Sequence, residues 1–260
     1  MSTDSYFRRL DTARFDATEN LSGAWSTSEQ HIAPTIGLLT HLVEADRDAR
    51  RGNDLRIARV SADILGVLTL DPVEVDVRVI RPGRTIELVE AELRQHGRAA
   101  VIFRAWLLQR TDTTELAGST LDPLPAREGM TGADFAERWP GGYVKTVTAH
   151  KRAIAPGRAQ CWIRPLLPLL DSEQTSPLAR MLGILDIANG LQPRVDPRTV
   201  AFPNVDFTAS FFRDPVGEWA GLDIRVSFGP DGTGLTATAL HDEQGPVGTL
   251  AQTLTLRALG

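Results

Sequence analysis

Runs in which apolar and polar residues alternate occur in both halves of this chain. Positions 73–79 read Val-Glu-Val-Asp-Val-Arg-Val, and positions 222–228 and 250–256 follow the same pattern. A period of two places successive side chains on opposite faces of a strand, so one face can pack on a core. Such alternation is typical of antiparallel sheets. The chain is therefore predicted to be rich in antiparallel strands.

Turn-forming segments separate these runs, at residues 81–83, 95–97, 229–232 and 242–245, each of which contains glycine. In the first half we expect strands at about residues 57–65, 73–79, 86–93 and 99–108. In the second half we expect them at about residues 143–151, 158–164, 203–213, 217–228, 233–241 and 246–258.

A helix precedes each block of four strands. The first is predicted at about residues 35–51 and ends at Gly52, a suitable C′ residue. The second opens at Ser176-Pro177, a hydroxyl N-cap followed by proline, and runs to about Asn189. It has almost no polar face, which indicates a buried helix. A helix wrapped by an antiparallel sheet is the hotdog arrangement.

The two halves share this plan. Ser61-Ala-Asp63 matches Asn204-Val-Asp206 at a constant offset, and Gly97 matches Gly245. The stretch 111–141 is rich in proline, glycine and threonine and is interpreted as a linker. We therefore predict an α+β double hotdog of two tandem units, with residues 1–127 as the first unit with its linker and 128–260 as the second.

Composition excludes several classes of function. The net charge of −5 argues against nucleic acid as the partner, because phosphate binding needs a basic face. No apolar run approaches the ~20 residues of a membrane span. The single cysteine, Cys161, allows no disulfide framework and is interpreted as a small buried side chain. We expect a cytoplasmic protein.

The motifs of several enzyme classes are missing from the sequence. It contains no Gly-x-Ser-x-Gly elbow, Walker loop or dinucleotide fingerprint. Its five histidines are scattered, without the spacing of helical metal ligands. We therefore expect no metal and no cofactor.

Asp186 is the most informative polar residue, because it interrupts the apolar second helix. No cation lies beside it on the helix surface, and the neighbouring Gly183 and Gly190 leave room for a ligand. A buried carboxylate without a partner costs several kcal/mol or has a raised pKa, which suits a general base. An aspartate satisfied by backbone or water is an equal alternative at this point.

Two amides are further candidates. The alternation places Gln252 on the core-facing side of its strand, where it must form a hydrogen bond. It either bonds across the strands or orients a water or a carbonyl. Asn204 stands at the start of a strand, where it is either a turn residue or an amide that points into the same site.

Several segments resemble double-hotdog acyl-CoA thioesterases of the thioesterase II type. Among them are Leu185-Asp-Ile-Ala-Asn-Gly190, Pro203-Asn-Val-Asp206 and Ala251-Gln252, together with parts of 157–180, 217–219 and 242–245. The family's catalytic aspartate and glutamine fall on Asp186 and Gln252. Its threonine or serine falls on Asn204, which is a departure from the pattern.

By the same matching, Ser61 and Arg104 are the first-half counterparts of Asn204 and Gln252. The resemblance therefore implies that the first unit supports the site without duplicating it.

The resemblance implies direct hydrolysis of an acyl-CoA or acyl-pantetheine thioester. Asp186 and Gln252 would activate a water, and helix N-terminal amides near Ser176–Ala179 or Ile36–Leu38 would polarise the carbonyl. The acyl chain would lie in the seam between helix and sheet. We expect a homo-oligomer, and the acyl chain length stays open.

Two other functions were weighed. The Asn204 departure favours a catalytically weak hotdog protein that binds acyl chains or a hydrophobic metabolite. A hotdog hydratase would need an aspartate and a histidine a few residues apart, and neither half contains such a pair.

Overall fold

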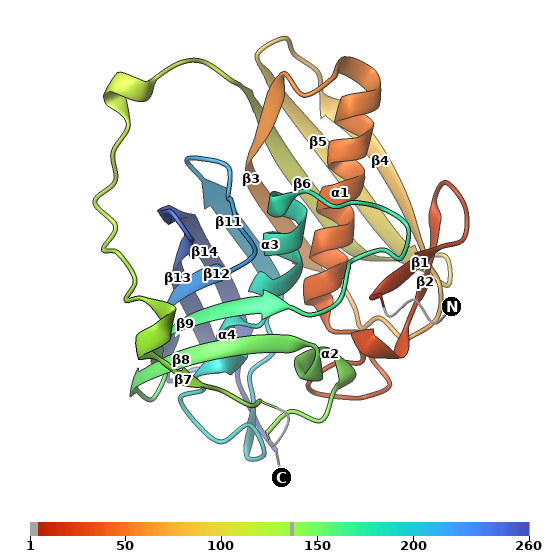
Figure 1. The fold of residues 1–260 in the computed structure, drawn as a ribbon. Helices are drawn as coiled ribbons and strands as arrows, with labels where there is room; N and C mark the ends of the chain where they lie inside the picture. The colour runs from red at the N-terminus through yellow and green to blue at the C-terminus, as the bar shows by residue number, and fades with distance from the viewer. Residues whose placement is uncertain (1–4, 136–137, 260) are drawn as a thin grey trace.

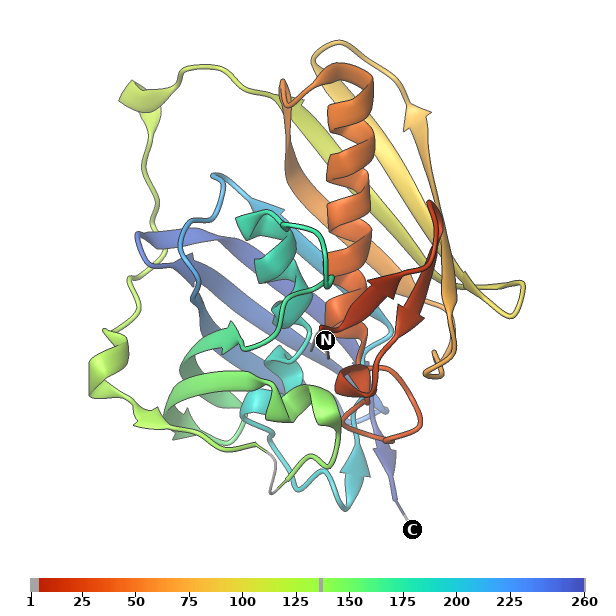
Figure 2. The same cartoon turned by 45° about the vertical axis from the view of Figure 1, so that its right-hand side comes forward.

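The computed structural model describes residues 5–135 and 138–259 of the chain. A large antiparallel sheet of 13 strands curves around two neighbouring helices, α1 (Ile32–Arg51) and α3 (Pro177–Leu185). Both helices lie against the same face of the sheet (Figures 1 and 2). The apolar core fills the space between the helices and this face.

The strands of the first half are β1 (Phe7–Arg9), β2 (Arg14–Ala17), β3 (Leu55–Ile64), β4 (Val73–Arg81), β5 (Ile86–Gln95) and β6 (Arg98–Gln109). Those that follow are β7 (Thr131–Gly132), β8 (Val147–Ala155), β9 (Arg158–Pro165), β10 (Val200–Ala201), β11 (Asp206–Phe211), β12 (Ala220–Phe228), β13 (Thr233–Asp242), β14 (Gly245–Thr255) and β15 (Arg257–Ala258). The short helices are η1 (Glu19–Leu21), η2 (Thr114–Leu116), η3 (Arg127–Gly129), α2 (Gly142–Lys145) and α4 (Ala188–Leu191).

The order of strands in the sheet is nearly symmetric about its centre. It runs β1-β2-β4-β5-β6-β3-β11-β14-β13-β12-β9-β8-β7, so β3 and β11 pair at the middle. Outward from the centre, the order is β3-β6-β5-β4 on one side and β11-β14-β13-β12 on the other. In each block of four, the first strand is thus followed by the fourth, the third and the second. The predicted blocks of four strands are therefore present, whereas β1 and β2 lie in a segment for which we predict no strands.

Helix α1 begins three residues earlier than predicted. His31 is its N-cap, and the ring Nδ1 accepts a hydrogen bond of 3.2 Å from the backbone N–H of Ala33. A histidine is not among the preferred N-cap residues, so the pattern did not reveal this start. The helix ends before Gly52, as predicted, and Gly52 has a φ of 67°.

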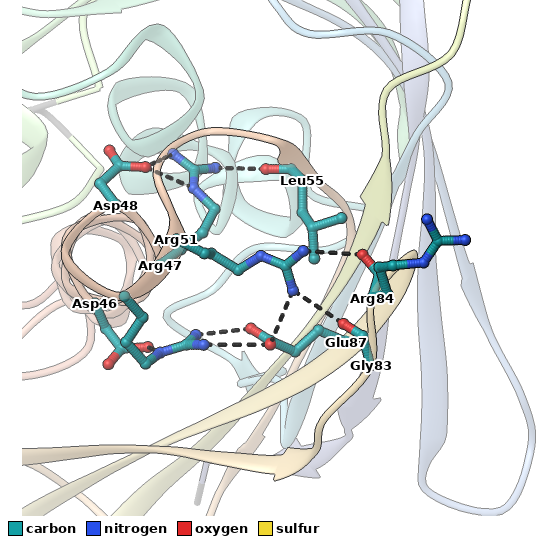
Figure 3. Close-up of polar contacts among 9 residues, drawn as sticks. Asp46, Arg47, Asp48, Arg51, Leu55, Gly83, Arg84 and Glu87 are labelled. Carbon is teal, nitrogen blue, oxygen red and sulfur yellow. Dashed lines mark hydrogen bonds and ion pairs between the residues drawn. The ribbon is translucent and has the colours of Figure 1, made fainter.

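An arginine cluster fastens the other end of α1 to the sheet (Figure 3). Glu87 of β5 is buried and accepts hydrogen bonds from Arg50 at 2.7 and 3.2 Å. Arg51 bonds the carbonyls of Gly83 and Arg84, each at 2.9 Å. These contacts join the last helical turn to β5 and to the turn before it, so the helix cannot slide along the sheet.

The two helices cross at a pair of glycines. A Cβ built on Gly37 would lie 2.7 Å from the Cα of Gly183 and 3.0 Å from the carbonyl oxygen of Ala179. A side chain at Gly37 therefore has no room. The close approach fixes where the start of α1 meets the end of α3.

The second helix is shorter than predicted. It ends at Leu185, Asp186 is its C-cap, and α4 begins at Ala188. Asp186 is therefore at a helix end and not in the middle of one. Residues 143–145, predicted as the start of a strand, lie in α2, Thr146 is the C-cap of that helix, and β8 begins at Val147.

The predicted linker 111–141 contains only short elements, and in Figure 1 its first part runs as an arc from β6. Among the described residues, no helix is long and apolar enough to cross a membrane.

Candidate active site

The structure brings Asp186, Asn204 and Gln252 together. The side-chain N–H₂ groups of Asn204 and Gln252 donate to the same carboxylate oxygen, Asp186 Oδ1, at 2.7 and 2.9 Å. The second oxygen, Oδ2, accepts none of the hydrogen bonds described for this part of the chain. Two amides thus hold one oxygen of this carboxylate.

Burial sets the charge of this carboxyl. Asp186 is 4% exposed, and desolvation raises its pKa to about 7. The hydrogen bonds from Asn204 and Gln252 oppose this rise, and the nearby charge of Asp206 adds to it. A carboxyl with a pKa near 7 can take up and return a proton at neutral pH, which suits a general base.

Asn204 is positioned by its place two residues before strand β11. Its backbone forms an isolated bridge with Leu254 of β14, and its amide also donates to the carbonyl of Asp206 at 3.0 Å. The strand itself begins at Asp206 and not at about residue 203. Where the resemblance places a hydroxyl, Asn204 supplies an N–H donor to the carboxylate.

Gln252 lies on β14 with its side chain on the helix-facing side of the sheet, as the alternation predicts, and it is 1% exposed. Its Nε2 also lies 3.4 Å from the backbone carbonyl of Asp186. The alternatives for Gln252 were a cross-strand bond or an amide that orients a water or a carbonyl. The structure shows its Nε2 in contact with the end of α3 at Asp186.

A cavity of about 300 Å³ opens beside Asp186 and Asn204. Loops from the first half form one wall and the end of α3 forms the other. The lining residues are Gly23–Ser26, Glu29–Ile32, Ile64–Leu68, Trp139, Val144, Asp186, Ile187, Asn189, Gly190, Pro203 and Asn204. Two tryptophans, Trp25 and Trp139, meet edge-on at 4.9 Å and make part of this wall aromatic.

His31 is a residue of this wall that the sequence did not single out. Because its Nδ1 accepts a hydrogen bond from Ala33, the proton of the neutral ring is on Nε2. Burial lowers the pKa of His31 to about 3, so the ring stays neutral. It stacks on Tyr143 at 4.2 Å between centroids. Only its cavity-lining position, not its sequence context, reveals it.

Three expectations need correction. Gly183 does not leave room for a ligand, because it packs on Gly37, whereas Gly190 packs on the ring of Trp139 and lines the cavity. Neither Ser176–Ala179 nor Ile36–Leu38 lines this cavity, and the α1 N-terminus that does line it lies earlier, at Ile32. The seam between α3 and the sheet is filled by its own apolar side chains, so the cavity lies at the helix end.

The matching of Arg104 with Gln252 is also wrong. Arg104 donates to Glu90 at 2.8 Å, and its side chain is 45% exposed. The turn and bulge between β5 and β6 match those between β13 and β14 at an offset of 147 residues. With this offset, the residue of the first half that is equivalent to Gln252 is the fully buried Ala105, so the first half has no amide at that position.

Models of two domain families match the chain. The acyl-CoA thioesterase N-terminal domain matches residues 21–108, and the acyl-CoA thioesterase C-terminal domain matches residues 118–256. No curated protein matches the sequence.

Solved structures share the fold over nearly the whole chain. A proposed thioesterase from Novosphingobium aromaticivorans has a TM-score of 0.72 at 17% identity, covering 97% of this chain and 98% of that chain. A hot dog fold protein of unknown function from Alicyclobacillus acidocaldarius gives 0.73 at 13%, with coverages of 97% and 96%.

A third solved structure is an acyl-CoA thioesterase II from Mycobacterium marinum. Its TM-score is 0.65 at 14% identity, with 98% of this chain and 95% of that chain covered. The fold is thus the α+β hotdog fold. With both domain models matched in order along the sequence, the chain belongs to the acyl-CoA thioesterase family and is a thioester hydrolase.

Proposed function

We propose that this protein hydrolyses acyl-CoA thioesters by direct attack of water, with Asp186 as the general base and Asn204 and Gln252 as its positioning amides. The observation that carries the proposal is the shared bond of both amides to Asp186 Oδ1, at the edge of a cavity. Residues 1–127 and 128–260 act as two hotdog units, of which the second carries this group. The near-symmetric strand order and the 147-residue offset support that division.

Asp186 both accepts and returns the proton that hydrolysis moves. Asp186 takes a proton from a water while the water oxygen bonds to the thioester carbon. The C–S bond then breaks, and the thiolate leaves with the proton that Asp186 returns. General-base assistance of this kind contributes ~10²–10⁴ in rate.

The start of α1 polarises the thioester carbonyl. Ile32, the first helical residue, lines the cavity, and the helix N-terminus carries partial positive charge. Two residues of the first helical turn offer no free backbone donor: Pro34 has no N–H, and the Ala33 N–H donates to the ring of His31. The proton on His31 Nε2 adds a neutral donor to the same wall, so the developing oxyanion meets a helix dipole and an imidazole N–H.

The acyl group packs against the aromatic wall. Trp139 is 5% exposed, and its Nε1 donates to the carbonyl of Gly190 at 3.3 Å, which holds the ring in place. Trp25 is 39% exposed, so it marks the side on which the cavity opens. A cavity of about 300 Å³ suits a short or medium acyl group better than a long one.

Asn204 weakens the case for a binding-only protein. That alternative rested on the missing hydroxyl, but the Asn204 amide makes a hydrogen bond of 2.7 Å to the carboxylate. Asn204 therefore supplies a donor to the carboxylate at the position where the resemblance implies a hydroxyl.

The deciding experiment measures thiol release from a panel of acyl-CoA esters of increasing chain length. Wild type should turn over at least one short or medium ester, and Asp186→Asn should lose ~10²-fold or more in kcat. The matched control is Asp231→Asn, an exposed carboxylate in the β12–β13 turn. Equal turnover by wild type and Asp186→Asn overturns the proposal.

A further inference from the structure

Three buried polar atoms beside the site have no hydrogen-bond partner within the described residues. They are Gln252 Oε1 and the hydroxyl oxygens of Thr236 and Thr238. Thr236 is fully buried, and Thr238 is 3% exposed. An unpaired buried polar atom lowers the stability of the folded state by about 1–3 kcal/mol, so we expect these atoms to have a partner or a function.

Strand pairing puts two of these atoms side by side. Thr236 of β13 is directly opposite Gln252 of β14, and Thr238 is opposite Leu250. All of these side chains are on the helix-facing side, whereas Ala237 and Ala251 between them are exposed. Directly opposite residues have Cβ atoms about 5 Å apart, so the Thr236 hydroxyl adjoins the Gln252 side chain.

Gln252 needs a donor at its oxygen. Its Nε2 is engaged with Asp186, but Oε1 can only accept. Its neighbours on the same face of β14, Leu250 and Leu254, have no donor. The hydroxyl of Thr236, directly opposite Gln252, is a donor, and a single bridging water would connect it to Oε1.

We propose that Thr236 is a positioning residue for thioester hydrolysis. Its hydroxyl donates to one bound water, which in turn donates to Gln252 Oε1 and keeps the amide turned so that Nε2 faces Asp186. The inference rests on the proposed function, because it assigns Thr236 a role through Gln252 and not through contact with the substrate.

Loss of the hydroxyl has a consequence for the base. If the Gln252 amide rotates, Asp186 Oδ1 loses one of its two donors, and a smaller fraction of the carboxyl is ionised at neutral pH. The other polar groups near Asp186 stay in place: Asp206 from β11, Asn204 before it, Tyr143 from α2 and His31 at the start of α1. A change in the pH profile can therefore be attributed to Gln252.

The test compares Thr236→Val, Thr236→Ser and the control Thr238→Val. We expect Thr236→Val to lower kcat about tenfold at pH 7 and to move the acid limb of the pH profile upward, with KM nearly unchanged. Thr236→Ser should restore most of kcat and the wild-type midpoint. Thr238→Val, opposite Leu250, should behave as wild type.

Stability separates this role from a structural one. If Thr236 is only a buried hydroxyl, Thr236→Val leaves kcat and the pH midpoint unchanged and the protein equally or more stable, which overturns the inference. If Thr236→Val does not fold, the contrast between Thr236→Ala and Thr236→Ser decides in the same way. An active Asp186→Asn defeats the proposed function itself, whereas an inactive Asp186→Asn beside a wild-type-like Thr236→Val defeats only the role of Thr236.

Discussion

Gln252 Nε2 lies 2.9 Å from Asp186 Oδ1, although 66 residues separate them along the chain. The contact ties the last long strand of the sheet to the end of α3. Asn204 approaches the same oxygen from the start of β11. Both amides therefore hold one oxygen of a carboxyl that lines the cavity.

Activity should depend on pH through Asp186. Its pKa of about 7 predicts that kcat/KM falls about tenfold per pH unit below that value, because the protonated carboxyl cannot accept a proton from water. Initial rates of thiol release between pH 5 and 9 measure this limb, with circular dichroism at each pH to confirm that the protein stays folded. A midpoint near 4 would contradict the raised pKa.

Stability should show the opposite trend over the same range. The pKa of Asp186 is about 7 in the folded protein against an ordinary 3.8, so between these values the native state binds more protons than the unfolded chain. The free energy of unfolding therefore decreases as pH rises through this window, by on the order of 4 kcal/mol at most.

Asp186→Asn removes this contribution. Urea unfolding at pH 4.5 and pH 8 should show that the variant gains stability relative to wild type at the higher pH. The same difference between the two proteins at both pH values would show that Asp186 does not titrate in this window.

His31 has two roles that substitutions can separate. Asparagine is a preferred N-cap residue, so His31→Asn keeps the bond to the Ala33 N–H but removes the ring donor on Nε2. We expect kcat to fall ~10²-fold, as for loss of one oxyanion donor, with stability close to wild type. His31→Ala should lose the same activity and about 1 kcal/mol of stability besides. Full kcat in His31→Asn would exclude the ring from the reaction.

Period-two alternation was sufficient to predict the strands that face the helices. The blocks β3–β6 and β11–β14 were placed within a few residues, because alternation and glycine turns act locally. Strands β1 and β2 are only 3 and 4 residues long, too short for a period to be visible. The break of the second helix at Asp186 depends on tertiary contacts of its side chain, which no local pattern encodes.

The site was predictable where polarity conflicts with burial. Asp186 and Gln252 each interrupt an apolar face, and that conflict identified them. His31 stands in a polar stretch and Thr236 in a threonine-rich strand, so neither conflicts with its surroundings in sequence. Only the register between β13 and β14 places Thr236 beside Gln252. The wrong counterpart, Arg104, came from matching Gly97 with Gly245, whereas the strand register matches Arg98 with Gly245.

Stability should respond differently to alanine at Gly37 and at Gly183, the two glycines where α1 and α3 cross, so one variant is a control for the other. Gly37→Ala would drive a Cβ to within 2.7 Å of the Gly183 Cα, which is backbone and cannot yield, so the helices must separate. Gly183→Ala places its Cβ 3.4 Å from the Gly37 Cα, an ordinary contact. Alanine also favours a helix by about 1 kcal/mol over glycine.

We therefore expect Gly37→Ala to destabilise the protein by about 1–3 kcal/mol and Gly183→Ala to be neutral or stabilising. Because the crossing sets the distance between His31 at the start of α1 and Asp186 at the end of α3, Gly37→Ala should also lower kcat under conditions where it is fully folded. Urea unfolding and thiol-release rates on the two variants measure both effects. Equal stability of the two would mean that the helices can separate here without cost, and the site would then be fixed by the loops alone.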